Sequence, residues 1–502
     1  MGYDVVIAGA GAAGCVVASR LSEDPKRSVL LLEAGPDYPD PTMVPPEILS
    51  IVSPAHTHDW GYTSEPSFHG RSLRLPRGKL VGGCSATNAA IALRGAEADY
   101  DEWAAFGGPE WSFREVLPFF RLLEDDRDFD TEWHGRGGPL PIGRARFEDL
   151  APVHRAFLEA CREAGYPRVV DHNAPAAVGA GPLPLNALGG VRQSTALTYL
   201  ARGRVRPNLT VRGDAMVDRV RLVGNRAVGV RLAGSGEEIS GGSVILAGGT
   251  YGSPAILMRS GIGPAEHLRT IGVAEREDLD GVGRSLRDHP LLGLRFAAVP
   301  PVPQAPFAQT ALSLKSSQEN PGQDIQIFPS SVLATDAGKS PTMAHFIVFA
   351  SIVKPLSTGR LTLRSADPSD APLINPGYFT DPADMPCMID AVRKARLLSR
   401  TLSLSRLSAG ELYPGPGVTD SDSDLQAAIL AKGETYHHAV GTCRMGFAGD
   451  HRAVVDSKGK VHGMDRLYVV DASVFPIIPA ANTHVPVIMT AERCAAWLAE
   501  TV

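Results

Sequence analysis

The chain has 502 residues, of which 44% are hydrophobic and 21% charged, with a formal net charge of -6 at pH 7. This composition supports a large buried core and argues against disorder, and the scattered charge offers no basic patch for nucleic acid, so we expect a small-molecule partner. The N-terminus enters an apolar strand without a basic leader and no stretch reaches ~18 apolar residues, which predicts a cytoplasmic protein without membrane insertion.

A strand, a glycine-rich turn and a helix open the chain. Residues 3–8 are apolar and β-branched, and residues 15–22 carry an apolar stripe at helical spacing before a second strand at 28–35. This order is typical of a βαβ unit. Two amphipathic helices separated by a Gly-Gly-Pro break are predicted over 99–122, and another over 153–164.

Short strands dominate the next part of the chain. Residues 209–248 alternate apolar and polar positions around Gly and Asn, which predicts antiparallel strands. A proline-rich stretch at 299–306 predicts a domain boundary, because proline supplies no amide hydrogen to a sheet. Further strands and one helix are predicted beyond it, at 324–328, 344–353 and 359–365 and at 387–405.

The six cysteines are widely spaced and form no C-x-x-C pair. That spacing argues against zinc ligation and against a disulfide scaffold, and we predict no metal site. Most of these cysteines are expected to be small buried apolar residues.

The first glycine turn has the features of a dinucleotide site. Gly9, Gly11 and Gly14 lie between strand and helix, where backbone amides reach a pyrophosphate, and Glu33 ends the next strand, where a carboxylate accepts hydrogen bonds from a ribose. The fingerprint alone leaves NAD and FAD open. Two further glycine-rich loops, at 77–88 and 248–264, favour a long enclosed cofactor over a nicotinamide that comes and goes.

Six segments spread over nearly the whole chain resemble the glucose-methanol-choline (GMC) family of FAD-dependent oxidoreductases. They are the fingerprint at 9–14, GKLVGGCSATN at 78–88, GTYGSPAILMRSGIG at 249–263, GVGRSLRDHP at 281–290, HHAVGTCRMG at 437–446 and LYVVDASVFP at 467–476. The resemblance implies an α/β (α+β) protein in which a Rossmann-like FAD-binding domain is interleaved with a substrate-binding domain built on a largely antiparallel sheet with helices.

The resemblance also implies a division of the chain into three parts. Residues 1–292 would form the FAD-binding domain with some substrate-side insertions, residues 293–434 the substrate-binding domain, and residues 435–502 a return to the FAD domain that carries the catalytic pair. Carried over position by position, the FAD-binding residues would be Gly9, Gly11, Ala12, Ala13, Gly14, Glu33, Ala34, Val81, Gly82, Gly83, Ser85, Asn88, Ala89, Val217, Asp471, Ala472 and Thr483. Trp60 is either a further contact or a core tryptophan.

Two positions in the second glycine loop depart from the pattern of many family members. Cys84 stands where many carry Ser or Gly, and Thr87 stands where many carry an aliphatic residue. Choline-oxidizing members with a covalent flavin have a histidine at the position of Thr87. Threonine offers no equivalent nitrogen nucleophile, so the resemblance implies noncovalent FAD.

A catalytic pair follows from the resemblance of the C-terminal segments. The register of GTCRMG identifies His438 as the proton-accepting base, and counting onward with Pro486 as anchor gives Asn482 as its partner. Asn482 would bind the alcohol oxygen while His438 takes the proton and hydride moves to flavin N5. His437 would shape the pocket. His484 lies two residues beyond Asn482, so an alignment error of one or two residues would change the assigned pair.

Two other positions bear on this assignment. Ala439 replaces the proline that commonly follows the catalytic histidine. His289, in the RDHP segment, is expected to be structural or flavin-proximal rather than catalytic.

The expected function is oxidation of the CH-OH group of an alcohol, with oxygen or another electron acceptor regenerating the flavin. A flavin-dependent lyase or photodecarboxylase on the same fold and a non-enzymatic flavoprotein remain alternatives. The pocket is expected between 293 and 434, with Phe328, His345 and Phe346 as walls or as core residues of a sheet. Few charged residues lie there, which favours an apolar or aromatic primary alcohol; the sequence leaves the oligomeric state open.

Overall fold

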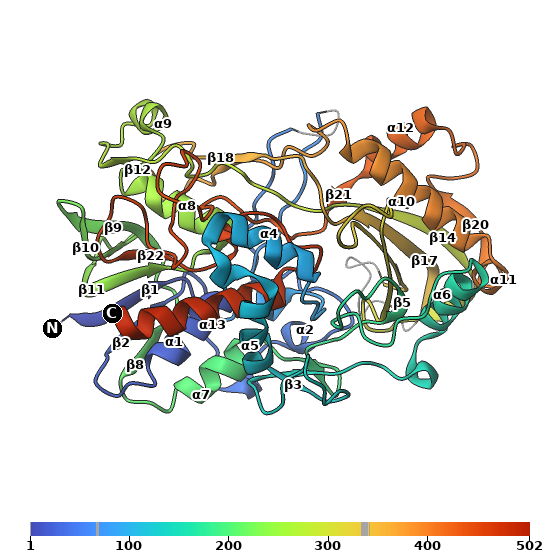
Figure 1. Ribbon diagram of the computed structural model, residues 1–502, viewed down its shortest axis with the longest axis horizontal. Coiled ribbons are helices and arrows are strands. Elements are labelled where there is room, and N and C mark those ends of the chain that lie inside the picture. Colours follow the sequence, from blue (N-terminus) through green and yellow to red (C-terminus); the bar gives the residue numbers. More distant parts are fainter. Residues whose placement is uncertain (1, 67–69, 333–339, 341) are drawn as a thin grey trace.

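Two seven-stranded sheets lie side by side in the computed structural model, which describes residues 2–66, 70–332, 340 and 342–502. The first sheet is at the left of Figure 1, where both chain termini also lie, and the second is at the right. Helices and sheets mix within each half. The predicted fold class is confirmed.

The first sheet contains the predicted βαβ unit and is parallel around it. Its order is β8-β2-β1-β11-β10-β9, with β22 beside β11. Strands β8, β2, β1, β11 and β22 run parallel, and β11, β10 and β9 pair antiparallel. The bounds are β1 Tyr3–Ala8, β2 Val29–Leu32, β8 Leu209–Arg212, β9 Val217–Val223, β10 Arg226–Leu232, β11 Glu238–Leu246 and β22 Leu467–Val469.

The parallel pairing of β8 corrects the prediction for residues 209–248. Only β9, β10 and the first half of β11 form the expected antiparallel meander. The second half of β11 leaves it and pairs parallel with β1 from Val5 to Ala8. Alternating polarity marks a half-buried strand but does not say which neighbour it pairs with, and here the neighbours lie far away in sequence.

Helices α1 (Ala12–Leu21) and α13 (His484–Thr501) pack against each other beside this sheet. Val16, Val17 and Leu21 of α1 are fully buried. Burial of each such side chain is worth about 1.5–3 kcal/mol. The packing joins the two ends of the chain, and it places the segment just before α13 against the glycine turn that begins α1.

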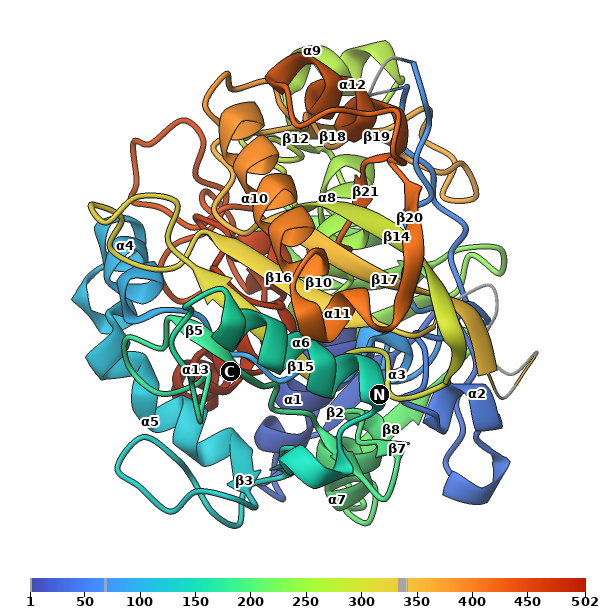
Figure 2. The ribbon, with the colours of Figure 1, turned by 90° about the vertical axis from the view of Figure 1, so that its right-hand side faces the viewer.

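The second sheet is antiparallel throughout. Its order is β20-β14-β17-β16-β15-β5, with β21 beside β14. Figure 2 shows α6 and α10 across its outer face. The bounds are β5 Gly179–Pro182, β14 Pro290–Pro303, β15 Thr310–Leu314, β16 Ile325–Ser330, β17 Thr342–Ile352, β20 Ser408–Tyr413, β21 Glu434–Thr435, α6 Pro152–Glu163 and α10 Asp384–Ser399.

The proline-rich stretch is not a break in the chain. Strand β14 continues through Pro300 and Pro301 to Pro303, and its pairing with β17 shifts register between Ala297 and Val302. The prolines therefore occupy an irregularity within a long strand, where their missing amide hydrogens do not interrupt a regular ladder.

The two faces of the second sheet have different neighbours. On β14, Leu292, Leu294 and Phe296 belong to the apolar core that includes residues of α6 and α10. The alternate residues Leu291 and Arg295 line a cavity on the opposite face. The strand period of two thus divides core residues from candidate site residues.

The remaining elements are helices and two-stranded ladders around the two sheets. The predicted helices at 99–122 and 153–164 are confirmed as α4, α5 and α6, and the helix at 387–405 as α10 followed by α11. The other helices are α2 Pro46–Leu49, α3 Cys84–Thr87, α4 Glu97–Gly107, α5 Phe113–Leu123, α7 Ala201–Gly203, α8 Gly249–Arg259, α9 Ala265–Thr270, α11 Leu402–Ser405 and α12 Asp422–Lys432. Two-stranded ladders join β3 Glu124–Asp126 with β4 Leu140–Ile142, β6 Ala187–Leu188 with β7 Val191–Arg192, β12 Ile262–Gly263 with β13 Glu277–Asp278, and β18 Arg360–Thr362 with β19 Leu373–Asn375.

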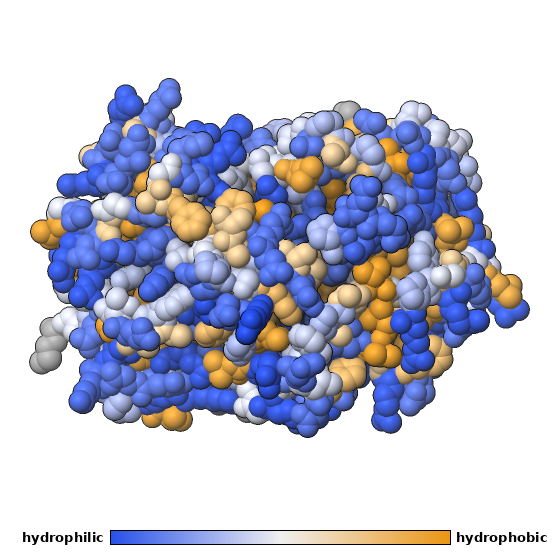
Figure 3. Space-filling view, in the orientation of Figure 1, coloured by the Kyte–Doolittle hydropathy of each residue, from blue (hydrophilic) through white to orange (hydrophobic). Residues whose placement is uncertain are grey.

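The face in Figure 3 is mostly hydrophilic, with apolar side chains in small groups between polar ones. In the described parts of the chain, no helix combines the length and apolar character that crossing a bilayer requires.

Candidate functional site

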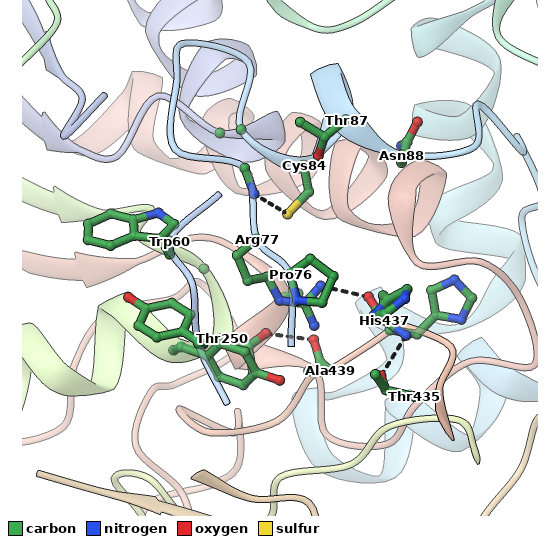
Figure 4. A pocket seen from close by; sticks show the side chains of 18 of the residues that line it. Trp60, Pro76, Arg77, Cys84, Thr87, Asn88, Thr250, Thr435, His437 and Ala439 are labelled. Atoms are coloured by element: carbon green, nitrogen blue, oxygen red, sulfur yellow. Dashed lines mark hydrogen bonds between the residues drawn. The ribbon is translucent and has the colours of Figure 1, made fainter. Parts of the chain in front are cut away.

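One cavity of about 1020 Å³ is lined by residues of both sheets and of the loops between them. On the side of the first sheet its walls are the glycine turn and the ends of the parallel strands. On the side of the second sheet they are β14, β17 and the segment around His438. Figure 4 shows some of the residues that line the cavity, with Trp60 on one side and His437 on the other.

The glycine turn fits a cofactor that presses against backbone. Gly9, Gly11, Ala12 and Ala13 line the cavity, and the first amides of α1 have no partner within the helix. Gly9 has a φ of 106°, and a Cβ there would come within 2.4 Å of the Ala247 carbonyl oxygen. The turn thus offers unpaired N–H groups in a form that suits a pyrophosphate.

Gly14 has a packing role instead. It does not line the cavity, and a Cβ at this position would meet the Gly9 carbonyl oxygen at 1.9 Å. Its missing side chain therefore lets α1 approach the turn closely.

Glu33 holds the turn in place from the next strand. Its Oε2 accepts a hydrogen bond from the Ala10 amide at 2.9 Å, and its Oε1 accepts one from the Gly35 amide at 3.1 Å. Burial raises the pKa of Glu33 to about 7, although these amide hydrogen bonds oppose the rise. Glu33, Ala34 and Val217 all line the cavity.

The second glycine loop touches the first. A Cβ on Gly83 would lie 2.7 Å from the Gly11 Cα, so the loops meet this closely only with glycine at position 83. Gly83, Ser85, Asn88 and Ala89 line the cavity, and so do Cys84 and Thr87, the two positions that depart from the family pattern (Figure 4). Val81 and Gly82 are not among the lining residues, and Val81 instead donates its amide hydrogen to Pro36.

Trp60 also lines the cavity. Its ring stacks on Tyr62 with the ring centroids 5.7 Å apart, and the Lys79 ammonium lies 4.8 Å from the centroid of the indole. The tryptophan is therefore held by neighbours on its other sides while it forms part of the wall.

Asp471 joins the third glycine loop to the C-terminal part of the chain. Its Oδ2 accepts hydrogen bonds from the Ser253 hydroxyl at 2.6 Å and from the Gly249 amide at 2.8 Å. Asp471, Ala472 and Thr483 line the cavity, which brings residues from the end of the sequence to the N-terminal glycine turn.

The structure brings His438 and Asn482 together. His438 Nε2 lies 3.1 Å from Asn482 Nδ2, and the two residues are only 8% and 7% exposed. Burial lowers the pKa of His438 well below its ordinary value, and His289, His437 and Arg77 lower it further. A neutral imidazole with an amide beside it can accept a proton from a hydroxyl group.

Several hydrogen bonds hold the backbone around His438. The Asp288 Oδ1 accepts the His438 amide hydrogen at 2.7 Å, and the Thr250 hydroxyl donates to the Ala439 carbonyl at 2.7 Å. Arg77 donates to the carbonyl of His437, which has a left-handed φ of 67° (Figure 4). Side chains thus fix the loop at Ala439, the position where the resemblance implies a proline.

His437 and His484 also face the cavity. His437 lines the cavity, and its pKa is lowered to about 3 by loss of solvation and by the nearby charges of Arg77 and His56. His484 begins α13, and burial lowers its pKa to about 4. Neither histidine contacts Asn482 in the manner of His438.

The three residues predicted as substrate-side walls or as core do not line the cavity. Phe346 is fully buried in the core on the other face of β17, because it alternates with Ile347 and Phe349, which do line the cavity. Phe328 lies behind the wall, stacked on Phe349 with the ring centroids 4.9 Å apart. His345 does not line the cavity either.

The sequence reasoning missed other lining residues on this side. Leu291, Phe307 and Val332 form apolar wall, and Tyr436 lies next to His438, with the ring centroids 4.3 Å apart. The period of two along β14 and β17 could have identified Leu291, Ile347 and Phe349. Phe307 and Val332 lie outside the strands and carry no such signal.

Comparisons with known proteins match nearly the whole chain. Family models described as GMC oxidoreductase match residues 3–291 and 355–491. Mitochondrial choline dehydrogenase of Mus musculus is 35% identical over 536 residues, which cover 98% of this chain and 89% of the relative. Alcohol dehydrogenase [acceptor] of Pseudomonas putida is 34% identical over 528 residues, which cover 98% of this chain and 95% of the relative. The solved structure of pyridoxine 4-oxidase from Mesorbium loti is similar with a TM-score of 0.92 and 32% identity, and the match covers 100% of both chains.

Proposed function

Because the chain belongs to the GMC family of FAD-dependent oxidoreductases, which act on CH-OH donors, we propose that it oxidises a primary alcohol with His438 as base and Asn482 as its partner. The observation that carries this proposal is the approach of a neutral, buried imidazole to an amide at the cavity wall, 3.1 Å apart. An alcohol oxygen at this place would accept a hydrogen bond from Asn482 Nδ2 while its proton passes to His438 Nε2.

FAD supplies the hydride acceptor for this reaction when it is bound. The residues proposed to hold it are those of the three glycine-rich loops, with Glu33 toward the ribose and Asp471 between the third loop and the C-terminal segment. Thr87 lines the cavity without a nitrogen nucleophile, which supports noncovalent binding.

The proposed roles follow the three parts of the sequence. Residues 1–292 supply the dinucleotide turn, residues 293–434 supply most of the second sheet, and residues 435–502 supply His438 and Asn482. The exceptions are β5 and α6, which precede residue 292 and pack in the second half. They support the proposal that the first part carries substrate-side insertions.

The substrate-side wall favours an apolar or aromatic alcohol. Leu291, Phe307, Ile347 and Phe349 supply apolar surface close to Tyr436. The lining carboxylate on this side, Glu434, has its pKa raised by burial, while three neighbouring cations lower it. Because neighbouring cations already offset the negative charge of Glu434, we expect it to bind a cationic substrate weakly. The apolar wall suits a ring or an alkyl chain.

The test uses the FAD-loaded protein under anaerobic conditions. A panel of primary alcohols with alkyl, aromatic, sugar and quaternary ammonium groups first identifies the alcohol that reduces the flavin fastest, which we expect to be alkyl or aromatic. With that alcohol, His438→Ala should retain FAD and reduce it about 100- to 10,000-fold more slowly. Oxygen and a dye are then compared as acceptors.

His267→Ala is the matched control, because His267 lies outside the cavity and bonds the amide of Leu363. It should reduce FAD at the wild-type rate. Reduction at an unchanged rate in His438→Ala would contradict the proposed base. If no alcohol of the panel bleaches the flavin band, a lyase or a non-enzymatic flavoprotein replaces oxidation as the proposed function.

A further inference from the structure

His289 is a buried histidine that the proposed chemistry does not use. It is 0% exposed and does not line the cavity, yet its Nδ1 lies 3.0 Å from the Nδ1 of His438. The two rings are nearly perpendicular, at 84°. A contact between two ring nitrogens at this distance requires one hydrogen atom between them, so one ring donates and the other accepts.

The charge of His289 limits how the two rings can pair. Burial lowers the pKa of His289 to about 3, so this ring is neutral and carries one N–H. Its Nε2 is buried and has no hydrogen-bond partner among the described residues, so the contact with His438 is the side-chain hydrogen bond that this ring makes there. The Nδ1 of His289 can therefore accept a hydrogen from His438 or donate one to it.

The far side of His438 sets the direction of this hydrogen bond. The Tyr436 hydroxyl donates to Gln326 Oε1 at 2.9 Å, which leaves the phenol oxygen as an acceptor. Burial raises the pKa of Tyr436, and a hydrogen bond from Asn482 opposes the rise, so the amide N–H end of Asn482 faces this oxygen. The same Nδ2 lies 3.1 Å from His438 Nε2. An N–H donor there requires a lone pair on Nε2.

We propose that His289 is a positioning residue that fixes the tautomer of His438. By accepting the Nδ1–H of His438, it leaves the lone pair on Nε2, the nitrogen that faces Asn482. The inference rests on the proposed function in one respect only, that Nε2 is the atom that takes the alcohol proton. It adds a residue that acts through the base and does not touch the substrate.

The proton taken from the alcohol stays on His438 in this arrangement. Lys354 lowers the pKa of His289, and its own charge is held by Asp99 and Glu102. A second positive charge on His289 is thus disfavoured, and the ring remains an acceptor. When His438 is protonated at Nε2, its Nδ1–H still donates to His289, so the ring keeps its orientation through the transfer.

The test reads the tautomer directly in FAD-loaded protein labelled with ¹⁵N-histidine. Nitrogen chemical shifts separate a protonated ring nitrogen from one with a lone pair, and a His438→Gln variant assigns the signals of His438. In the wild-type protein, His438 should carry its hydrogen on Nδ1 and His289 on Nε2. In His289→Leu, which offers no acceptor to the Nδ1–H, the hydrogen of His438 should move to Nε2, and the Asn482 amide should turn to accept it through Oδ1, which has no partner in the described part of the wild-type protein. A wild-type His438 protonated on Nε2, or no change in His289→Leu, would overturn the proposal.

Kinetics separates positioning from packing. The Oδ1 of His289→Asn can take the place of the Nδ1 lone pair, so this variant should keep most of the reduction rate, whereas His289→Leu should lose on the order of 100-fold in limiting rate with a smaller change in KM. Equal losses in the two variants would overturn the proposal.

His154→Leu serves as the matched control for this experiment. His154 is another fully buried histidine, bonded to Thr310 at 3.0 Å and outside the cavity, and its replacement should leave the tautomer of His438 unchanged. If no alcohol reduces the flavin while the wild-type and variant tautomers are as stated, the proposed function fails and the positioning inference stands. If alcohols reduce it normally and the tautomer is reversed, the inference alone fails.

Discussion

Buried histidines at two places in this protein differ in charge: those at the cavity are neutral, and His134 is positively charged. At the cavity, the ring of His438 contacts His289 and Asn482, which are neutral groups, and burial lowers the pKa of both histidines. Outside the cavity, burial also lowers the pKa of His134, but the carboxylates of Asp126, Asp171 and Glu124 raise it more, to about 10. Burial therefore does not decide the charge of a histidine; the groups that face its ring nitrogens do.

The geometry around His134 explains its charge. Nδ1 lies 3.0 Å from Asp126 Oδ2 and 3.3 Å from Glu124 Oε1, and Nε2 lies 2.9 Å from Asp171 Oδ2. Both ring nitrogens thus face carboxylate oxygens, which only the doubly protonated imidazolium can satisfy. Arg94 pairs with Glu124, and Arg144 pairs with the two aspartates.

A proton on His134 balances the charges of this cluster. The three buried carboxylates and the two arginines leave one negative charge, which the imidazolium cancels; Asp128, which also pairs with Arg144, is 36% exposed. Glu124, Asp126 and His134 also lie close enough together to hold a metal ion. The arginines already pair with the carboxylates, however, so a divalent ion would leave the buried cluster positive.

The largest effect that would test this comparison is expected for His134→Leu. Removing the imidazolium leaves an uncompensated buried carboxylate, which should lower the free energy of unfolding by about 3–5 kcal/mol. Denaturant unfolding of the FAD-loaded protein measures it. His154→Leu removes a buried neutral histidine, with an expected loss of about 1–3 kcal/mol from the unpaired Thr310 hydroxyl. Equal losses in the two variants would mean that His134 is not charged.

A carboxylate placed beside His438 should raise its pKa, as the carboxylates around His134 raise the pKa of that histidine. In Asn482→Asp, a charge next to Nε2 should raise the pKa of His438 by about 1–3 units. Since only the unprotonated base accepts a proton, the acidic limb of the anaerobic reduction rate should move to higher pH. Asn482→Ala is the control: it should slow reduction by about 100- to 1,000-fold without moving that limb upward. If the acidic limb of the rate profile does not move in Asn482→Asp, the charge of His438 is not set by the groups that face its ring nitrogens.

The smallest effect is the pH dependence of stability. The folded pKa of His134, about 10, lies above the ordinary value of 6.5, so its contribution is fully present below pH 6.5 and is lost as the pH rises to about 10. This group gives a slope of at most about 1.4 kcal/mol per pH unit. Chemical unfolding at several pH values measures the slope, and His134→Leu should lack it. An identical slope in that variant would assign the effect to other groups.

Local patterns were sufficient for the elements that begin the chain. The glycine turn, α1 and Glu33 follow one another within one βαβ unit, and the structure places them as predicted. The pairing of β8 with β2 was missed because alternation does not identify a neighbour. The sequence left Phe346 as either wall or core, because a shift of one residue along β17 exchanges the two, and the structure places it in the core.

The sequence by itself predicted the glycine turn between strand and helix and, through the resemblance of its C-terminal motifs, the pairing of His438 with Asn482, which the structure brings together. These depend on residues close together or on recognisable segments. Only the tertiary structure decided the charge of each histidine. His289 and His438 are separated by 149 positions, and His134 and Asp171 by 37. The pKa and the tautomer of a buried ring depend on atoms within hydrogen-bond distance, and folding alone brings those atoms together.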